Sequence, residues 1–93
     1  MIKSIKHKGL KRFFETGNTR GIRSEHERRL RLRLATLNAA ATLADISNAG
    51  NWDMHSLTGN LGGKYAIRVS GNWRLFFEFE NGDVYLLDYD DYH

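Results

Sequence analysis

The sequence predicts an α+β fold, a small antiparallel sheet with two N-terminal helices packed on one of its faces. Two observations predict it. Hydrophobic residues recur at helical spacing in the first half of the chain, and they alternate with period two from Trp52 onward. Helical patterns followed by strand patterns, without alternation between them, are typical of α+β domains. A chain of 93 residues suffices for one core, so we expect residues 1–93 to form a single domain.

The first elements are short. Residues 1–5 suit a first strand. Leu10, Phe13 and Phe14 then follow the i, i+3, i+4 spacing of an amphipathic helix, and Gly17 is placed to end that helix as a glycine C-cap. The polar residues 17–23, with two glycines, are expected to form a loop.

The second helix has a clear start signal, because Ser24 followed by Glu27 matches a capping box. We expect the helix to run to about residue 42, with a short helical turn through Ile46 after it. One apolar stripe runs along this helix, formed by Leu30, Leu34, Leu37 and Ala41. The arginines are expected mostly around its other side: Arg28, Arg29, Arg31 and Arg33.

Three segments with strand character follow, at residues 65–70, 73–80 and 84–89, with an edge strand expected near His55. Residues 70–72 are expected to form a short hairpin loop, and Asn81-Gly82 matches a two-residue type I′ turn. Pairing through the first loop would bring Arg68 and Arg74 together on the sheet face that the helices leave open. An anion between the two guanidinium groups, or a surface salt-bridge network with Glu78, would then compensate their charge.

The charge is unevenly distributed along the chain. Residues 1–34 hold eleven Lys and Arg against three acids, a net +8, and residues 35–93 hold three against eight, a net −5. A basic half on a small protein favours a polyanionic partner such as nucleic acid or the ribosome. The alternative is a solvated helix face without a partner.

Composition excludes several classes of site. The chain contains no cysteine, which excludes disulfides, thiolate zinc sites, iron–sulfur clusters and cysteine nucleophiles, and suits a reducing cytoplasm. No apolar run approaches the roughly 18–20 residues of a membrane span, and no signal peptide is recognisable. The four histidines lack metal-ligand spacing, so we expect no metal site, and His7 and His26 look like ordinary surface residues.

The remaining candidates are His, Tyr and Arg side chains. These residue types suit cleavage of RNA through its own 2′-hydroxyl. Such a reaction needs a base for the 2′-OH, an acid for the departing 5′-oxygen and cations for the phosphate charge.

Several segments together resemble the HigB toxins of the RelE/ParE superfamily of type II toxin–antitoxin systems. They are the first ten residues, the segment His55-Ser-Leu-Thr-Gly59, the run from Ile67 to Leu75 with its Trp-Arg pair, and the ending that closes on Asp91-Tyr92-His93. The resemblance implies a ribosome-dependent messenger-RNA endonuclease without a cofactor. It also implies a HigA-type helix-turn-helix antitoxin, which would neutralise the toxin and connect it indirectly to operator DNA.

The resemblance also implies site residues. Position by position, it assigns catalysis to His55, Arg74, Tyr92 and His93. Asp91, Arg68 and Lys64 are candidates for binding the substrate phosphate. Relatives can carry a lysine where this chain has Thr58. The basic helices would grip ribosomal RNA through Lys11, Arg12, Arg28, Arg29 and Arg33.

Two alternatives remain open from the sequence. A toxin of the ParE branch would inhibit DNA gyrase and cut no RNA, and an inactive toxin fold would serve only as a binding module. His55 and the Asp91-Tyr92-His93 ending favour the nuclease, whereas Thr58 keeps the binding module under consideration.

Overall fold

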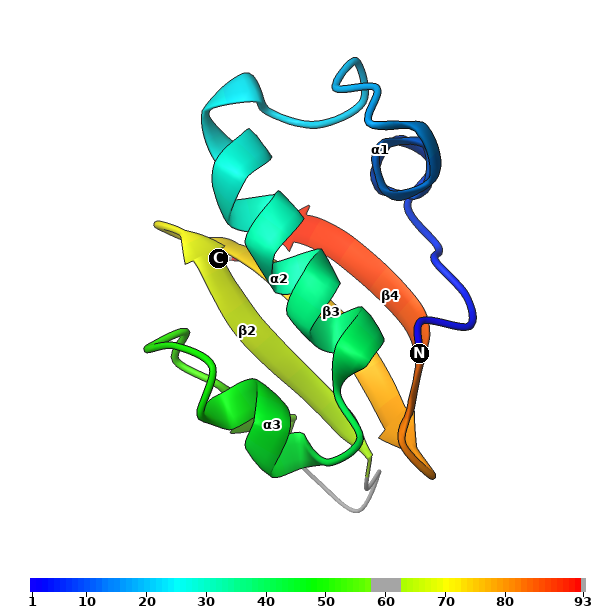
Figure 1. Ribbon diagram of the computed structural model, residues 1–93. Coiled ribbons are helices and arrows are strands. Elements are labelled where there is room, and N and C mark those ends of the chain that lie inside the picture. Colours follow the sequence, from blue (N-terminus) through cyan, green and yellow to red (C-terminus); the bar gives the residue numbers. More distant parts are fainter. Residues whose placement is uncertain (58–62, 93) are drawn as a thin grey trace.

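The computed structural model describes residues 1–57 and 63–92 and has the expected α+β architecture (Figure 1). The helices are α1 (Lys8–Thr16), the short 3-10 helix η1 (Ser24–His26), α2 (Glu27–Ala39) and α3 (Leu43–Ser47). The strands are β1 (His55–Ser56), β2 (Lys64–Ser70), β3 (Trp73–Glu80) and β4 (Asp83–Asp91). They form a four-stranded antiparallel meander in the order β1-β2-β3-β4.

The helices cover one face of the sheet, with α2 lying across its middle (Figure 1). The core fills the space between these two layers. Leu10 of α1 and Leu30 and Leu37 of α2 are fully buried there, as are Ile67 of β2 and Leu75 of β3. Because successive strand residues point to opposite faces, the period-two pattern of the sequence places one set of side chains in the core and the other on the open face.

Helix α1 begins and ends at recognisable caps. The ring Nδ1 of His7 accepts a hydrogen bond from the Leu10 amide at 3.0 Å, so the prediction of an ordinary surface residue is wrong at this position. Gly17 ends the helix as predicted. It adopts a left-handed conformation with φ 81° and donates its N–H to the Phe13 carbonyl.

The predicted start of α2 is wrong. Ser24 lies in η1, no side chain caps the first turn of α2, and the Glu27 carboxylate binds Arg31 at 2.6 Å instead of the backbone. The helix also ends at Ala39, so Ala40 is buried and Ala41 is exposed, although Ala41 was expected to continue the apolar stripe.

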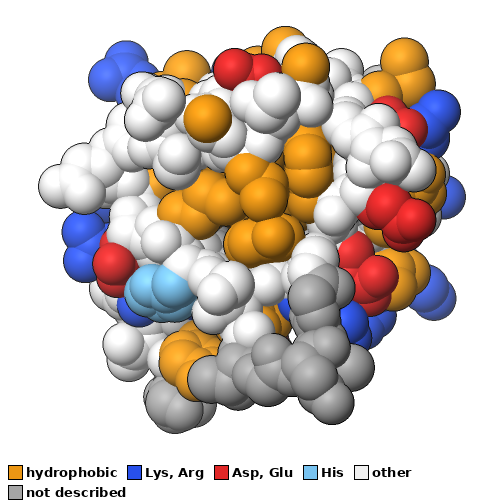
Figure 2. Space-filling model, turned by 90° about the horizontal axis from the view of Figure 1, so that it is seen from below, with side chains coloured by type: hydrophobic (Ala, Val, Ile, Leu, Met, Phe, Trp, Pro, Cys, Tyr) orange, Lys and Arg blue, Asp and Glu red, His pale blue; other side chains and the backbone are white. Residues whose placement is uncertain are grey.

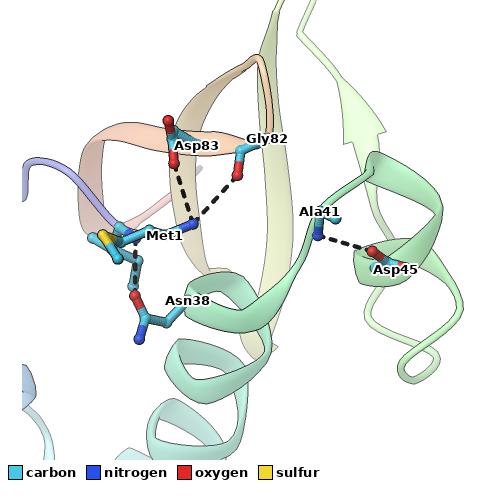
Figure 3. A network of polar contacts seen from close by, with 7 residues as sticks. Met1, Asn38, Ala41, Asp45, Gly82 and Asp83 are labelled. Atoms are coloured by element: carbon cyan, nitrogen blue, oxygen red, sulfur yellow. Dashed lines mark hydrogen bonds and ion pairs between the residues drawn. The ribbon is translucent and has the colours of Figure 1, made fainter.

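A capping box does occur, at the next helix. Thr42 accepts a hydrogen bond from the Asp45 amide, and the Asp45 carboxylate accepts from the amides of Thr42 and Ala41. These reciprocal bonds hold α3, which is the short helical turn that the sequence predicts through Ile46. The Asp45 bond to the Ala41 amide is drawn in Figure 3.

The β3–β4 turn matches its prediction, because Asn81 and Gly82 both have positive φ, at 52° and 82°. The β4 strand contains a bulge. Pairing shifts register between Phe76 and Glu78, and Leu86 adopts φ 52° with its side chain exposed. The bulge keeps Leu87 in the core and turns Leu86 outward.

The N-terminal segment runs beside β4 and covers that edge of the sheet. Ile2 and Ile5 make isolated parallel bridges to Val84 and Leu87, so residues 1–5 pair with the sheet but form no continuous strand. The Met1 ammonium lies 3.3 Å from the Gly82 carbonyl and 3.4 Å from the Asp83 carboxylate (Figure 3). The Ile2 amide donates to the Asn38 side chain and ties the segment to the end of α2.

The end of the molecule near α3 and the β3–β4 turn shows hydrophobic side chains at its centre, with charged side chains at its margins (Figure 2). Partly buried residues such as Leu43 and Met54 pack against the core. Among the described residues, no helix is long and apolar enough to span a membrane.

Candidate functional site

The open face of the sheet carries the predicted arginine pair. Arg68 of β2 and Arg74 of β3 are direct partners in the β2–β3 ladder, so both project from the face opposite the helices. Side chains at such positions have Cβ atoms about 5 Å apart. The prediction from the hairpin is therefore confirmed, and Asp90 of β4, the other ladder partner of Arg74, lies on the same face.

His55 reaches the same face from the neighbouring strand. It lies in β1 opposite Ala66 of β2, and Ala66 in turn pairs with Phe76 of β3. The imidazole is exposed, and its Nδ1 lies 3.8 Å from the Asp53 carboxylate. Asp53, two residues before the start of β1, has φ 52°, a conformation that a non-glycine residue seldom adopts.

Tyr92 completes this group from the end of β4. Its ring packs on Phe76 with the centroids 5.9 Å apart, and its amide donates to the Asn72 carbonyl at 2.8 Å. The side chain is 59% exposed, so its hydroxyl is accessible. The structure thus brings His55, Arg68, Arg74 and Tyr92 to one face from four strands; we call this the outer-face cluster.

Hydrophobic side chains that were not among the predicted site residues lie beside the outer-face cluster. A hollow of about 270 Å³ lies beside Phe76, lined also by Leu57, Leu86, Lys64 and Asp88 among others. Phe76 has the same strand parity as Arg74, and this parity could have placed it on the outer face. Alternation from Leu87 and Tyr89 also turns Leu86 outward, whereas alternation from the buried Val84 does not, because the bulge lies between them.

On the outer face of the sheet, Glu78 and Arg74 have different partners. Glu78, the predicted alternative partner of the arginines, lies 3.7 Å from the Lys64 ammonium. Arg74 instead donates to the carbonyl oxygens of Gly71 at 2.7 Å and Trp73 at 3.3 Å. These acceptors are neutral, so they orient the guanidinium without cancelling its charge.

Two predicted positions, Thr58 and His93, lie outside the described residues. Asp91 is the last residue of β4 and pairs with Trp73 in the ladder, which assigns it to the opposite strand parity from Arg74. Within residues 1–57 and 63–92, no three His, Asp or Glu side chains are grouped so that they could hold a metal ion.

The basic residues predicted to contact ribosomal RNA differ in their exposure to solvent. Lys11, Arg12, Arg28 and Arg29 are exposed on α1 and α2. Arg33 is only 8% exposed, so its expected place on the solvated side of α2 is wrong. Its guanidinium lies over the Trp52 ring, 4.7 Å from the centroid, and donates to the carbonyls of Arg68 and Arg29. A long aliphatic stem and neutral acceptors allow an arginine to be buried in this way.

His26 also departs from expectation. It is 3% exposed rather than on the surface, and its Nδ1 lies 2.6 Å from the Tyr89 hydroxyl. The Tyr89 oxygen also accepts the Arg23 amide at 3.4 Å. Burial lowers the pKa of His26 and raises the pKa of Tyr89.

Residues 3–93 match the family model described as the RelE-like toxin of the type II toxin–antitoxin system HigB. The chain belongs to this HigB-like toxin family. The toxin is also 43% identical over 93 residues, the full length of both chains, to a protein of Proteus vulgaris named Endoribonuclease HigB. A toxin of a type II system acts with an antitoxin, so this HigB-like toxin has an antitoxin partner. The RelE-like description agrees with the helices-on-sheet architecture above.

Proposed function

We propose that this HigB-like toxin is a ribosome-dependent endoribonuclease that cuts messenger RNA at the A-site codon and so stops translation. The outer-face cluster is the observation that carries the proposal, because it gathers histidine, tyrosine and paired arginines on one open face. The name of the Proteus vulgaris relative supports the same activity.

The proposed reaction needs no group beyond those of the toxin and the RNA. A base takes the proton of the 2′-hydroxyl, and the 2′-oxygen attacks the adjacent phosphorus. The bond from phosphorus to the 5′-oxygen then breaks as an acid protonates that oxygen. The products are a 2′,3′-cyclic phosphate and a 5′-hydroxyl. His55 and His93 are the proposed proton-transfer groups, and Tyr92 is proposed to position them or to share the proton transfer.

Arg74 and Arg68 are the proposed phosphate clamp. Negative charge builds up on the phosphoryl oxygens as the 2′-oxygen attacks, and cations fixed in advance stabilise that charge without reorganising. The carbonyls of Gly71 and Trp73 fix Arg74 in this way. Lys64, the first residue of β2, is proposed as a further cation for the phosphate, and Asp91 stays a candidate for binding the substrate there.

The proposed partners follow from the same activity. A HigA-type helix-turn-helix antitoxin would neutralise the toxin and bring it to operator DNA only indirectly. The 70S ribosome and its message would be the target, in the cytoplasm. Lys11, Arg12, Arg28 and Arg29 would contact ribosomal RNA through their exposed charges.

Primer extension on a defined message tests the proposal, with purified toxin and with or without programmed ribosomes. We expect cuts inside the A-site codon only when ribosomes are present. If folded toxin produced no cuts, the proposed nuclease activity would be rejected, and gyrase inhibition or a role as a binding module would remain. Equal cutting of free message would reject the dependence on the ribosome.

Arg74→Lys sharpens this test, because it keeps the charge and removes the planar fork that binds two phosphoryl oxygens. We expect about 100-fold slower cleavage, in line with the loss of one preorganised transition-state donor. Arg20→Lys, at an exposed loop position outside the cluster, is the matched control. Equal rates for these two variants would remove Arg74 from the proposed site.

A further inference from the structure

A separate pocket of about 340 Å³ opens beside the outer-face cluster. It lies between α2, the segment before β1 and the β2–β3 hairpin. Its lining residues are Arg29, Arg33, Asn51, Arg68, Val69, Ser70 and Gly71, and we call it the arginine pocket. Its volume lies near the lower end of the range for small-ligand sites, about 300–1,000 Å³.

Three arginines, Arg29, Arg33 and Arg68, line the arginine pocket, and no Asp or Glu in the described part of the chain does. Among the described residues, none of these arginines has an acidic side chain within ion-pair distance. Burial, and then the charges of Arg29 and Arg68, lower the pKa of Arg33. An anion in the pocket would relieve this repulsion.

The base of the pocket is already ordered. Arg33 donates its Nε to the Arg68 carbonyl at 2.8 Å and its Nη1 to the Arg29 carbonyl at 3.1 Å, while its plane rests on Trp52. Since both acceptors are neutral, its charge remains available. A guanidinium held in one orientation loses little conformational freedom on binding, which favours affinity.

Arg68 connects this pocket to the proposed catalytic face. It lines the pocket and is also the ladder partner of Arg74. We propose that the arginine pocket binds a backbone phosphate of RNA next to the strand held at Arg74. This inference rests on the proposed function for its RNA, and the shared chemistry is a phosphodiester from either the message or ribosomal RNA.

The pocket can be tested without ribosomes, by titrating inorganic phosphate into the full chain. The indole N–H of Trp52 is followed by NMR, because its ring contacts Arg33. We expect a saturable shift of this signal in the native toxin and after Arg20→Gln, and about 10-fold weaker binding after Arg29→Gln. Both variants remove one exposed positive charge. No saturable shift, or equal weakening in the two variants, would overturn the site even if the toxin cuts RNA.

A second experiment identifies the source of the phosphate. Binding is compared on ribosomes whose message fills the A site and on ribosomes whose message ends at the P-site codon. Weaker binding of Arg29→Gln on both, relative to Arg20→Gln, supports a ribosomal RNA phosphate. A difference only when the A site is filled supports the message. No difference on either ribosome overturns the role in RNA binding.

Discussion

His26 shows how a single buried side chain makes stability depend on pH. Its Nδ1 makes a hydrogen bond of 2.6 Å with the Tyr89 hydroxyl, and the Tyr89 oxygen accepts from the Arg23 amide. Protonation of His26 would place a positive charge in this buried site, near the charges of Arg23 and Arg29. Trp73 packs against both rings, so the protein around them has little room to rearrange.

We therefore predict that the toxin is destabilised by acid in the range where His26 titrates. Because burial lowers the pKa of His26 in the folded state, the unfolded chain binds its proton first. The stabilisation is complete above the unfolded pKa of about 6.5 and is lost as pH falls toward the lower folded value. Urea unfolding at several pH values measures this loss. A His26→Gln variant with the same pH dependence as the native toxin would contradict the assignment.

Individual burial could be predicted from spacing but not from residue type. His26 lies four residues before Leu30 and Arg33 three residues after it, so both lie on the apolar face of the helical segment. Their polarity suggested the opposite side. Arg33 can be buried because Trp52 and two backbone carbonyls meet it there, and these groups come from distant parts of the chain.

At the scale of elements, the start of α2 shows that a capping-box motif in the sequence does not by itself determine where a helix begins. Ser24 and Glu27 have the spacing of a capping box, yet residues 24–26 form a 3-10 turn because His26 and the Arg23 amide are held by Tyr89. The strands were better predicted. Alternation, the Asn81-Gly82 turn and the 70–72 loop are local signals, and they sufficed to pair Arg68 with Arg74.

The two candidate capping sites provide a matched prediction. Thr42→Ala should lower the free energy of unfolding by about 1 kcal/mol, because it removes a cap that the Asp45 amide uses. Ser24→Ala should change it by less than about 0.5 kcal/mol, since Ser24 caps no helix. Chemical denaturation of both variants checks this, and a larger loss at Ser24 would show that the motif acts after all.

Helix α1 meets the following loop at a pair of glycines. A Cβ on Gly9 would overlap the backbone of Gly21, and a Cβ on Gly21 would overlap that of Gly9. We predict that Gly9→Ala destabilises the fold by about 1–3 kcal/mol, because backbone rather than a flexible side chain would have to move. Thermal unfolding measures it, and Lys8→Ala at the exposed neighbouring position is the control. Equal melting temperatures would show that the contact can relax.

At the scale of the molecule, the charge asymmetry survives folding only in part. Lys11, Arg12, Arg28 and Arg29 remain exposed, whereas Arg33 is buried. The sequence alone indicated that the first half of the chain is basic, and it predicted that Arg68 and Arg74 lie together on the open face of the sheet. The sequence could not predict the arginine pocket. Arg29, Asn51 and Arg68 come from separate segments and line one pocket only when α2 and the segment before β1 pack on β2.

Arg28→Glu should weaken association with ribosomes and lower its dependence on salt. Each lost phosphate contact is expected to reduce the slope of log affinity against log salt by about 0.7–0.9. The melting temperature should hardly change, because Arg28 is exposed. Sedimentation with ribosomes over a salt series measures the effect, and an unchanged slope would argue against a contact between Arg28 and ribosomal RNA.

The pairing of residues 1–5 with β4 joins two segments that are synthesised at well-separated times. The Met1 amine and the bridges at Ile2 and Ile5 all find their partners in residues 82–87. During synthesis, the N-terminal segment leaves the ribosome long before those partners exist. Tyr92 comes later still, so a growing chain lacks both its closing strand and part of its proposed site. Translating its message thus presents no assembled toxin to the ribosome that is making it.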